Sequence, residues 1–209
     1  MEITCIGHSG FLIELPEYNI IFDYFKDKKS VITPEIFKDK NTCVCVSHTH
    51  HDHYNTKIFD WSSLGDVTYI LDNGCKVPEK FANEKIITVR ESNDFDIFGG
   101  AVNVKTYGST DEGVSFLVTA GDFVIFHAGD LNDWYWEDES TPEELIQDEE
   151  SYLCIIKKLA GQKIDIAFIP NDPRLKHNAG RGIDHFKRIV APKKIIPMHF
   201  PGNDGVKYQ

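Results

Sequence analysis

The chain has 209 residues, 41% of them hydrophobic, and carries a formal net charge of −11 from 33 acidic and 22 basic residues. This length suits one domain with its own core, so a single domain over residues 1–209 is expected. No apolar run approaches the roughly 18 to 20 residues of a membrane span, which excludes membrane insertion. The acidic balance argues against a protein that coats nucleic acid, because such surfaces carry excess positive charge.

The first two-thirds of the chain contains short apolar segments rich in β-branched and aromatic residues, which predict strands. Turn residues, mostly glycine, separate these segments. The predicted strands cover 3–6, 11–15, 19–22, 42–46, 67–71, 85–89, 101–106, 114–119 and 123–126.

The last third of the chain changes to an α/β pattern. Residues 142–159 carry acidic side chains early and lysines late, as a helix with complementary end charges does. A second helix is predicted at 182–190, between strands at 164–169 and 193–197. The segment 137–150 holds eight acidic residues and no basic one. It is either a solvated loop and helix face or a mobile flap beside Trp134 and Trp136.

The amino terminus lacks the basic and long apolar regions of a secretory signal. The five cysteines form no C-x-x-C pair. We therefore expect reduced thiols and a cytoplasmic protein.

Four of the nine histidines lie within six positions, directly after the predicted buried strand 42–46. Residues two apart in an extended segment point the same way, so His48 and His50 can bind one ion. Asp52 and His53 can then reach a second ion beside it. Imidazole and carboxylate ligands suit zinc best, with manganese or iron as substitutes.

His48, His50, Asp52 and His53 match the H-x-H-x-D-H signature of the metallo-β-lactamase-fold hydrolases. The whole chain resembles this family. The resemblance implies that Asp130, after strand 123–126, bridges both metals and that His199, after strand 193–197, is the last ligand. It also implies a four-layer αββα sandwich of the α/β (α+β) class. The opening turn at Gly7–Gly10 and Asp23 look like the compact branch that includes the L-ascorbate-6-phosphate lactonase-like proteins.

One ligand of the family pattern is missing. The family's third histidine for the first metal should fall between residues 106 and 114, where none occurs. The first site is then weak, filled by water, or completed by another side chain. The candidates are Asp111, Glu112, Tyr107 and Asp172.

Two divalent cations can lower the pKa of a shared water and present a bridging hydroxide, so hydrolysis is the expected reaction. The expected catalytic residues are Asp52, Asp130 and His8, where His8 would bind substrate or protonate a leaving group. A structural role for His8 is an equal alternative. Arg174 lies in a short segment that also holds Lys176, His177 and Arg181, and an arginine fork there could bind an anion. Trp136 could form an apolar wall of the site.

The resulting hypothesis is a cytoplasmic hydrolase with two divalent metal ions, most simply Zn²⁺, acting on a small anionic ester, lactone or phosphodiester. One alternative is a non-catalytic metal-binding or ligand-sensing domain whose first metal site is degenerate. Another is a nuclease of the same fold, which the acidic balance disfavours. No membrane or nucleic-acid partner is expected, and assembly as a homo-oligomer is left open.

Overall fold

The computed structural model describes residues 1–208, which form two compact units. The first unit contains residues 1–89 and the segment that begins at Pro201, and the second contains residues 90–200. Each unit holds one β-sheet. The single domain expected over residues 1–209 stays a prediction.

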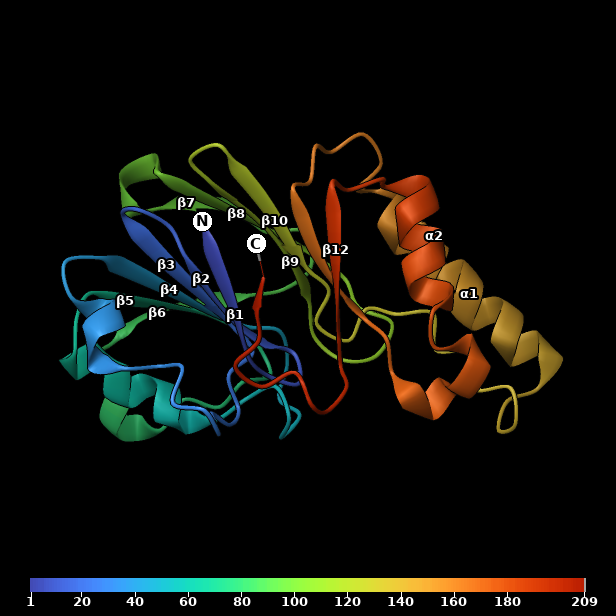
Figure 1. Ribbon diagram of the computed structural model, residues 1–209, viewed down its shortest axis with the longest axis horizontal. Coiled ribbons are helices and arrows are strands. Elements are labelled where there is room, and N and C mark those ends of the chain that lie inside the picture. The colour runs from blue at the N-terminus through green and yellow to red at the C-terminus, as the bar shows by residue number, and fades with distance from the viewer. Residues whose placement is uncertain (209) are drawn as a thin grey trace. The chain divides into compact units, whose positions relative to one another are not determined.

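The sheet of the first unit has seven strands in the order β13-β1-β2-β3-β4-β5-β6 (Figure 1). The strands from β3 to β6 run parallel, and the others pair antiparallel. The strands are β1 (Glu2–Gly7), β2 (Gly10–Glu14), β3 (Tyr18–Phe22), β4 (Asn41–Val46), β5 (Val67–Asp72), β6 (Lys85–Val89) and β13 (Lys207–Tyr208).

Short 3-10 helices accompany this sheet, and apolar packing joins them to it. They are η1 (Pro34–Phe37), η2 (Thr56–Ser63) and η3 (Glu79–Phe81). Val44 and Tyr69 of the sheet share one buried cluster with Phe59 and Trp61 of η2 and Phe37 of η1. Burial of such large side chains stabilises the unit by roughly 1.5–3 kcal/mol each. The loops on either side of β4 therefore extend from a well-packed sheet.

The sheet of the second unit has six strands in the order β12-β11-β10-β9-β8-β7. The strands β10, β11 and β12 run parallel, whereas β7 to β10 pair antiparallel. The elements are β7 (Asp94–Ile97), η4 (Phe98–Gly100), β8 (Val102–Tyr107), β9 (Ser115–Ala120), β10 (Phe123–His127), β11 (Ile166–Pro170), η5 (Pro173–Asn178) and β12 (Lys194–Met198).

Two α-helices, α1 (Pro142–Lys157) and α2 (Arg181–Ile189), belong to the second unit. They contact each other, and α2 also packs on β11 and β12 (Figure 1). Helix α1 begins with a capping box in which the Thr141 side chain accepts from the Glu144 amide, and the Glu144 carboxylate accepts from the Thr141 amide. The buried Tyr152 of α1 donates a hydrogen bond to the carbonyl of Gly182, which ties the two helices together.

The predicted strands and both helices are confirmed with shifts of one or two residues at their ends. Sequence analysis missed β7, β13 and the 3-10 helices. No helix among residues 1–208 is long and apolar enough to cross a membrane. Cys5, Cys43, Cys45, Cys75 and Cys154 are free cysteines in the structure.

Candidate metal centre

The histidine motif of the first unit begins where β4 ends. His48 and His53 are completely buried, and His50 is partly exposed. The ring of His48 lies 4.5 Å from that of His50 and 4.2 Å from that of His53, measured between centroids. The ligand atoms of His48 and His50 lie within 4.8 Å of each other, so this short segment places several nitrogen donors in a small volume.

Asp23 organises this motif from the neighbouring strand. Because β3 and β4 run parallel, with Phe22 opposite Cys45, the residues that follow them emerge at the same edge of the sheet. The buried Asp23 carboxylate accepts hydrogen bonds from the Ser47 amide (2.8 Å), the Ser47 hydroxyl (2.6 Å) and His53 Nδ1 (2.8 Å). The sequence offered no signal for this role beyond the position of Asp23 after a strand.

These hydrogen bonds determine the tautomers of two histidines. An ionised carboxylate only accepts, so His53 Nδ1 must carry the proton that it shares with Asp23. The single hydroxyl proton of Ser47 goes to Asp23, so Ser47 Oγ must accept from His48 Nδ1, 2.9 Å away. Both rings therefore present the lone pair of Nε2, the form in which imidazole binds a metal.

Asp52, His8 and His51 lie on the outer side of this motif. His8 Nε2 is 3.4 Å from Asp52 Oδ2. His51 Nδ1 is 4.0 Å from the other oxygen of Asp52, and the His51 side chain is 97% exposed. His8 and Asp52 are partly buried, whereas the side chain of His51 is exposed to solvent.

In the second unit, the parallel strands β10, β11 and β12 bring Asp130, Asp172 and His199 to one sheet edge. His199 Nδ1 lies 2.8 Å from Asp172 Oδ2, and His199 Nε2 lies 3.3 Å from Asp130 Oδ1. Burial raises the pKa of Asp172, but hydrogen bonds from His199 and Arg174 outweigh this effect and hold the pKa well below its usual value. Asp172 is therefore ionised and accepts from Nδ1 of His199, so that Nε2 is the ring nitrogen that faces Asp130.

The donor sets of both units fit a divalent cation. Separations of 3.3 and 3.4 Å between nitrogen and carboxylate oxygen exceed the usual 2.7–3.2 Å of a hydrogen bond. They match the edge of a tetrahedron with metal–ligand bonds of 2.0–2.1 Å, which is about 3.3–3.5 Å. A divalent cation between Nε2 of His199 and the Asp130 carboxylate could be bound by both groups.

The replacement ligands suggested by the sequence, Asp172 and Asp111, lie outside the clusters of candidate metal ligands described above. Asp172 faces Nδ1 of His199 and the side chain of Arg174, a position from which it can orient the His199 ring. Asp111 is exposed in the loop between β8 and β9, where its amide donates to Ser109 Oγ. The clusters of candidate metal ligands among residues 1–208 include neither of them.

Aromatic side chains extend outward from His199. The indole of Trp134 meets the His199 ring edge to face at 5.6 Å, and its nitrogen donates to the carbonyl of Asp130 at 3.0 Å. Trp136 stacks parallel to Trp134 at 6.0 Å and is half-buried. The guanidinium of Arg174 lies 5.4 Å from the centre of the Trp136 ring. The two predicted substrate-binding residues, Arg174 and Trp136, are thus in contact with each other.

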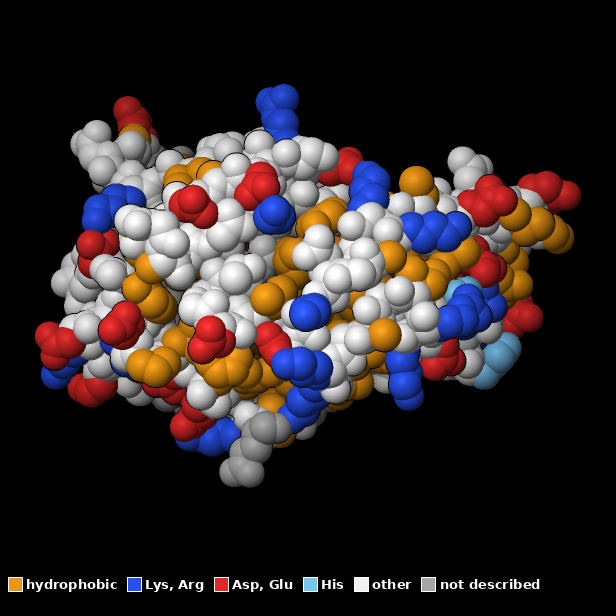
Figure 2. Space-filling model, turned by 90° about the horizontal axis from the view of Figure 1, so that it is seen from above, with side chains coloured by type: hydrophobic (Ala, Val, Ile, Leu, Met, Phe, Trp, Pro, Cys, Tyr) orange, Lys and Arg blue, Asp and Glu red, His pale blue; other side chains and the backbone are white. Residues whose placement is uncertain are grey.

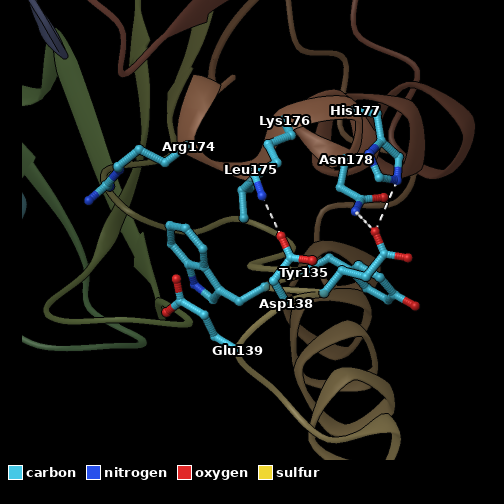
Figure 3. Close-up of a pocket in the computed structure, with 10 residues that line it drawn as sticks. Tyr135, Asp138, Glu139, Arg174, Leu175, Lys176, His177 and Asn178 are labelled. Atoms are coloured by element: carbon cyan, nitrogen blue, oxygen red, sulfur yellow. Dashed lines mark hydrogen bonds and ion pairs between the residues drawn. The ribbon is translucent and has the colours of Figure 1, made fainter.

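Most of the basic segment after β11 pairs with acidic side chains from the segment 133–150. The pairs are Lys176 with Asp138, His177 with Glu137, and Arg181 with Asp133 and Glu149. In Figure 3, Arg174 points away from the cluster that contains Lys176, His177 and Asn178. Lys176, His177 and Arg181 thus face acidic partners. Arg174 pairs with Asp172 instead, and its 63% exposed side chain is the candidate anion-binding group.

Arg181 also supports the loop that follows Asp130. Its Nε lies 2.9 Å from the fully buried Asp133 carboxylate, and its guanidinium lies over the Tyr135 ring at 3.9 Å. Burial raises the pKa of Asp133, although the ion pairs with Arg181 and His185 oppose the shift. Arg181 is therefore a structural residue and not the anion-binding one that its position in the basic segment suggested.

Three residues of the candidate centre have left-handed backbone conformations. They are His8 (φ 54°), Asp23 (φ 42°) and His199 (φ 69°). Such conformations are uncommon outside glycine, although His and Asp adopt them more often than most residues, and six other non-glycine residues among 1–208 also have them.

Known proteins share this sequence pattern and this architecture. The family described as "Beta-lactamase superfamily domain" matches residues 2–140. A UPF0173 metal-dependent hydrolase from Heliobacterium modesticaldum is 23% identical over 96% of this chain and 82% of its own length. The UPF0173 metal-dependent hydrolase YtkL from Bacillus subtilis is 25% identical over 96% of this chain and 86% of its own.

Solved structures agree on the fold. Igni18, a metallo hydrolase from Ignicoccus hospitalis, superposes with a TM-score of 0.69 at 13% identity, covering 100% of this chain and 98% of its own. The metallo-β-lactamase fold protein YhfI from Bacillus subtilis gives a TM-score of 0.58 at 12% identity, covering 99% and 98%. The two mixed sheets and their helices are thus those of the expected fold class. The chain belongs to the β-lactamase superfamily domain family and has the metallo-β-lactamase fold.

Proposed function

We propose that this member of the metallo-β-lactamase superfamily is a metal-dependent hydrolase with a dinuclear centre. The proposed ligands are those that the sequence motif predicts: His48, His50, Asp52, His53, Asp130 and His199. The observation that supports the proposal is that Nδ1 of His48, His53 and His199 is in each case held by a hydrogen-bond partner, an arrangement typical of metal-binding histidines. The relatives called metal-dependent hydrolases support the reaction class.

Two bound divalent ions, with zinc as the first choice, would lower the pKa of a shared water and supply a nucleophile at neutral pH. The chain's own residues hold the ligands in place. Asp23 holds His53 directly and His48 through Ser47, while Asp172 holds His199. Trp134 packs against the His199 ring, and both residues are buried.

The proposed substrate is a small anionic ester, lactone or phosphodiester. Arg174 supports this choice because its side chain is 63% exposed, while Asp172 and the Trp136 ring hold its guanidinium. A guanidinium fixed in this way binds carboxylate or phosphate at low entropic cost. Acidic and basic side chains both occur across the face shown in Figure 2, and the net charge of −11 disfavours a polyanionic substrate. The free thiols support a cytoplasmic location.

The test is metal analysis combined with a substrate screen. Chelator-treated protein is reloaded with Zn²⁺ or Mn²⁺ and assayed on lactones, phosphodiesters, carboxylic esters and thioesters. We expect two bound ions per chain and hydrolysis that His50→Ala abolishes and His51→Ala preserves. Hydrolysis that His50→Ala leaves unchanged would overturn the proposal. A single tightly bound ion without turnover would favour the alternative of a ligand-binding domain.

A further inference from the structure

The turn between β1 and β2 places a histidine beside the metal-binding motif. His8 follows Gly7 in this turn and has a left-handed backbone conformation, which is uncommon outside glycine although histidine adopts it more often than most residues. Its side chain is 20% exposed and directed toward Asp52. A strained backbone with a mostly buried imidazole indicates that the fold holds this ring in a defined place.

The distances around His8 are those between ligands of one ion. The 3.4 Å between His8 Nε2 and Asp52 Oδ2 is longer than a usual hydrogen bond and fits the tetrahedral edge of about 3.3–3.5 Å. The ligand atoms of His8, Asp52 and His53 lie within 4.8 Å of one another. The three side chains therefore surround a volume that one divalent cation can occupy.

Neighbouring rings hold His8 in this arrangement. Its ring meets the His53 ring edge to face at 5.5 Å and the Phe25 ring edge to face at 6.1 Å. Asp23 fixes His53 with Nε2 as its lone pair, so His53 is already oriented as a ligand. His8 thus belongs to an ordered group of rings and not to a flexible surface turn.

We propose that His8 is an additional ligand of the metal ion that Asp52 and His53 bind. This assignment rests on the proposed metal-dependent function and extends the ligand set beyond the H-x-H-x-D-H motif. A neutral imidazole adds a nitrogen donor without changing the charge of the site. Because imidazole suits zinc and iron better than manganese, His8 shifts the selectivity of this position toward zinc or iron.

His51 provides a matched control. Like His8 it lies beside Asp52, but its Nδ1 is 4.0 Å away and its side chain is 97% exposed. The test variants are His8→Asn and His51→Asn. Asparagine tolerates the left-handed conformation at position 8, so His8→Asn removes the imidazole while keeping the turn.

The experiment titrates Co²⁺ and Zn²⁺ into chelator-treated protein and records affinity, stoichiometry and the visible absorption of bound Co²⁺. We expect His8→Asn to weaken one of the bound equivalents at least tenfold, to change its Co²⁺ spectrum, and to weaken Zn²⁺ more than Mn²⁺. Added imidazole should partly restore the spectrum. His51→Asn should match the wild type, and circular dichroism in chelator checks that both variants fold.

If the wild type binds metal and His8→Asn binds it with the same affinity and the same Co²⁺ spectrum, the assignment is overturned and the proposed function stands. The same holds if His8→Asn changes only the pH dependence of turnover, which would make His8 a proton donor. If the wild type binds no metal, the proposed function itself is wrong.

Discussion

The substitution Asp23→Asn tests the hydrogen-bond relay that prepares two histidines for metal binding. Asn and Asp have the same shape, but an amide nitrogen at the position of Oδ2 would donate two hydrogen bonds where the carboxylate accepts two. His53 Nδ1 would then have to accept, so its proton moves to Nε2. Ser47 would donate to His48 Nδ1, and the His48 proton would move to Nε2 as well.

The expected magnitude follows from the number of ligands affected. Loss of one partner that orients a metal ligand lowers metal affinity by about 10–100-fold, which is about 1.4–2.7 kcal/mol. In the proposed assignment, His48 and His53 bind different ions, so Asp23→Asn should weaken both. Ser47→Ala interrupts only the branch to His48 and should weaken one ion. The hydrogen bonds survive in reversed direction, so the fold should remain.

The assay is competition of each variant with a chromophoric chelator for Zn²⁺, with the melting temperature measured in chelator. Asp66→Asn, which changes an exposed carboxylate that pairs with Lys85, is the control. Asp23→Asn that binds two zinc ions as tightly as the wild type would refute the tautomer argument. Equal loss of both ions in Ser47→Ala would refute the assignment of the two branches.

Three further predictions concern stability in the metal-free protein. The pKa of Asp172 is held below its usual value, so its carboxylate stabilises the fold above about pH 4, and this contribution is lost as pH falls through the folded pKa. In urea titrations, the difference in unfolding free energy between wild type and Asp172→Asn should stay constant from pH 7 to about pH 5 and shrink below that. A difference that grows in acid contradicts this prediction. Arg181→Met removes the shorter ion pair of the buried Asp133 and leaves it only His185, so the unfolding free energy should fall by an amount near the lower end of about 3–5 kcal/mol, because Arg181 is 29% exposed. Lys85→Met should lower it by less than about 1 kcal/mol. Thr141→Ala removes the capping box of α1 and should cost about 1 kcal/mol by the same measurement; an unchanged midpoint would show that the cap is not needed.

The strands and helices could be read from the sequence because their signals are local. Apolar β-branched segments and end-charge patterns act over a few residues, and nearly all of them became the expected elements. The strand β7 has the sequence Asp-Phe-Asp-Ile, and acidic residues are rare in strands, so only its pairing with β8 makes it one. The strand β13 is two residues long and forms by pairing with β1.

The candidate ligands could be proposed from the sequence for the same reason, since four of them lie within six positions after one strand. The sequence could not reveal that Asp23 orients His53 or that Asp172 orients His199. These partners are 30 and 27 residues apart, and only parallel strands bring them to one sheet edge. The formal charges of the basic segment also could not reveal which of its cations can bind an anionic ligand. Whether a cation can bind an anionic ligand depends on its neighbours in space, and Arg181 meets the buried Asp133 48 residues away.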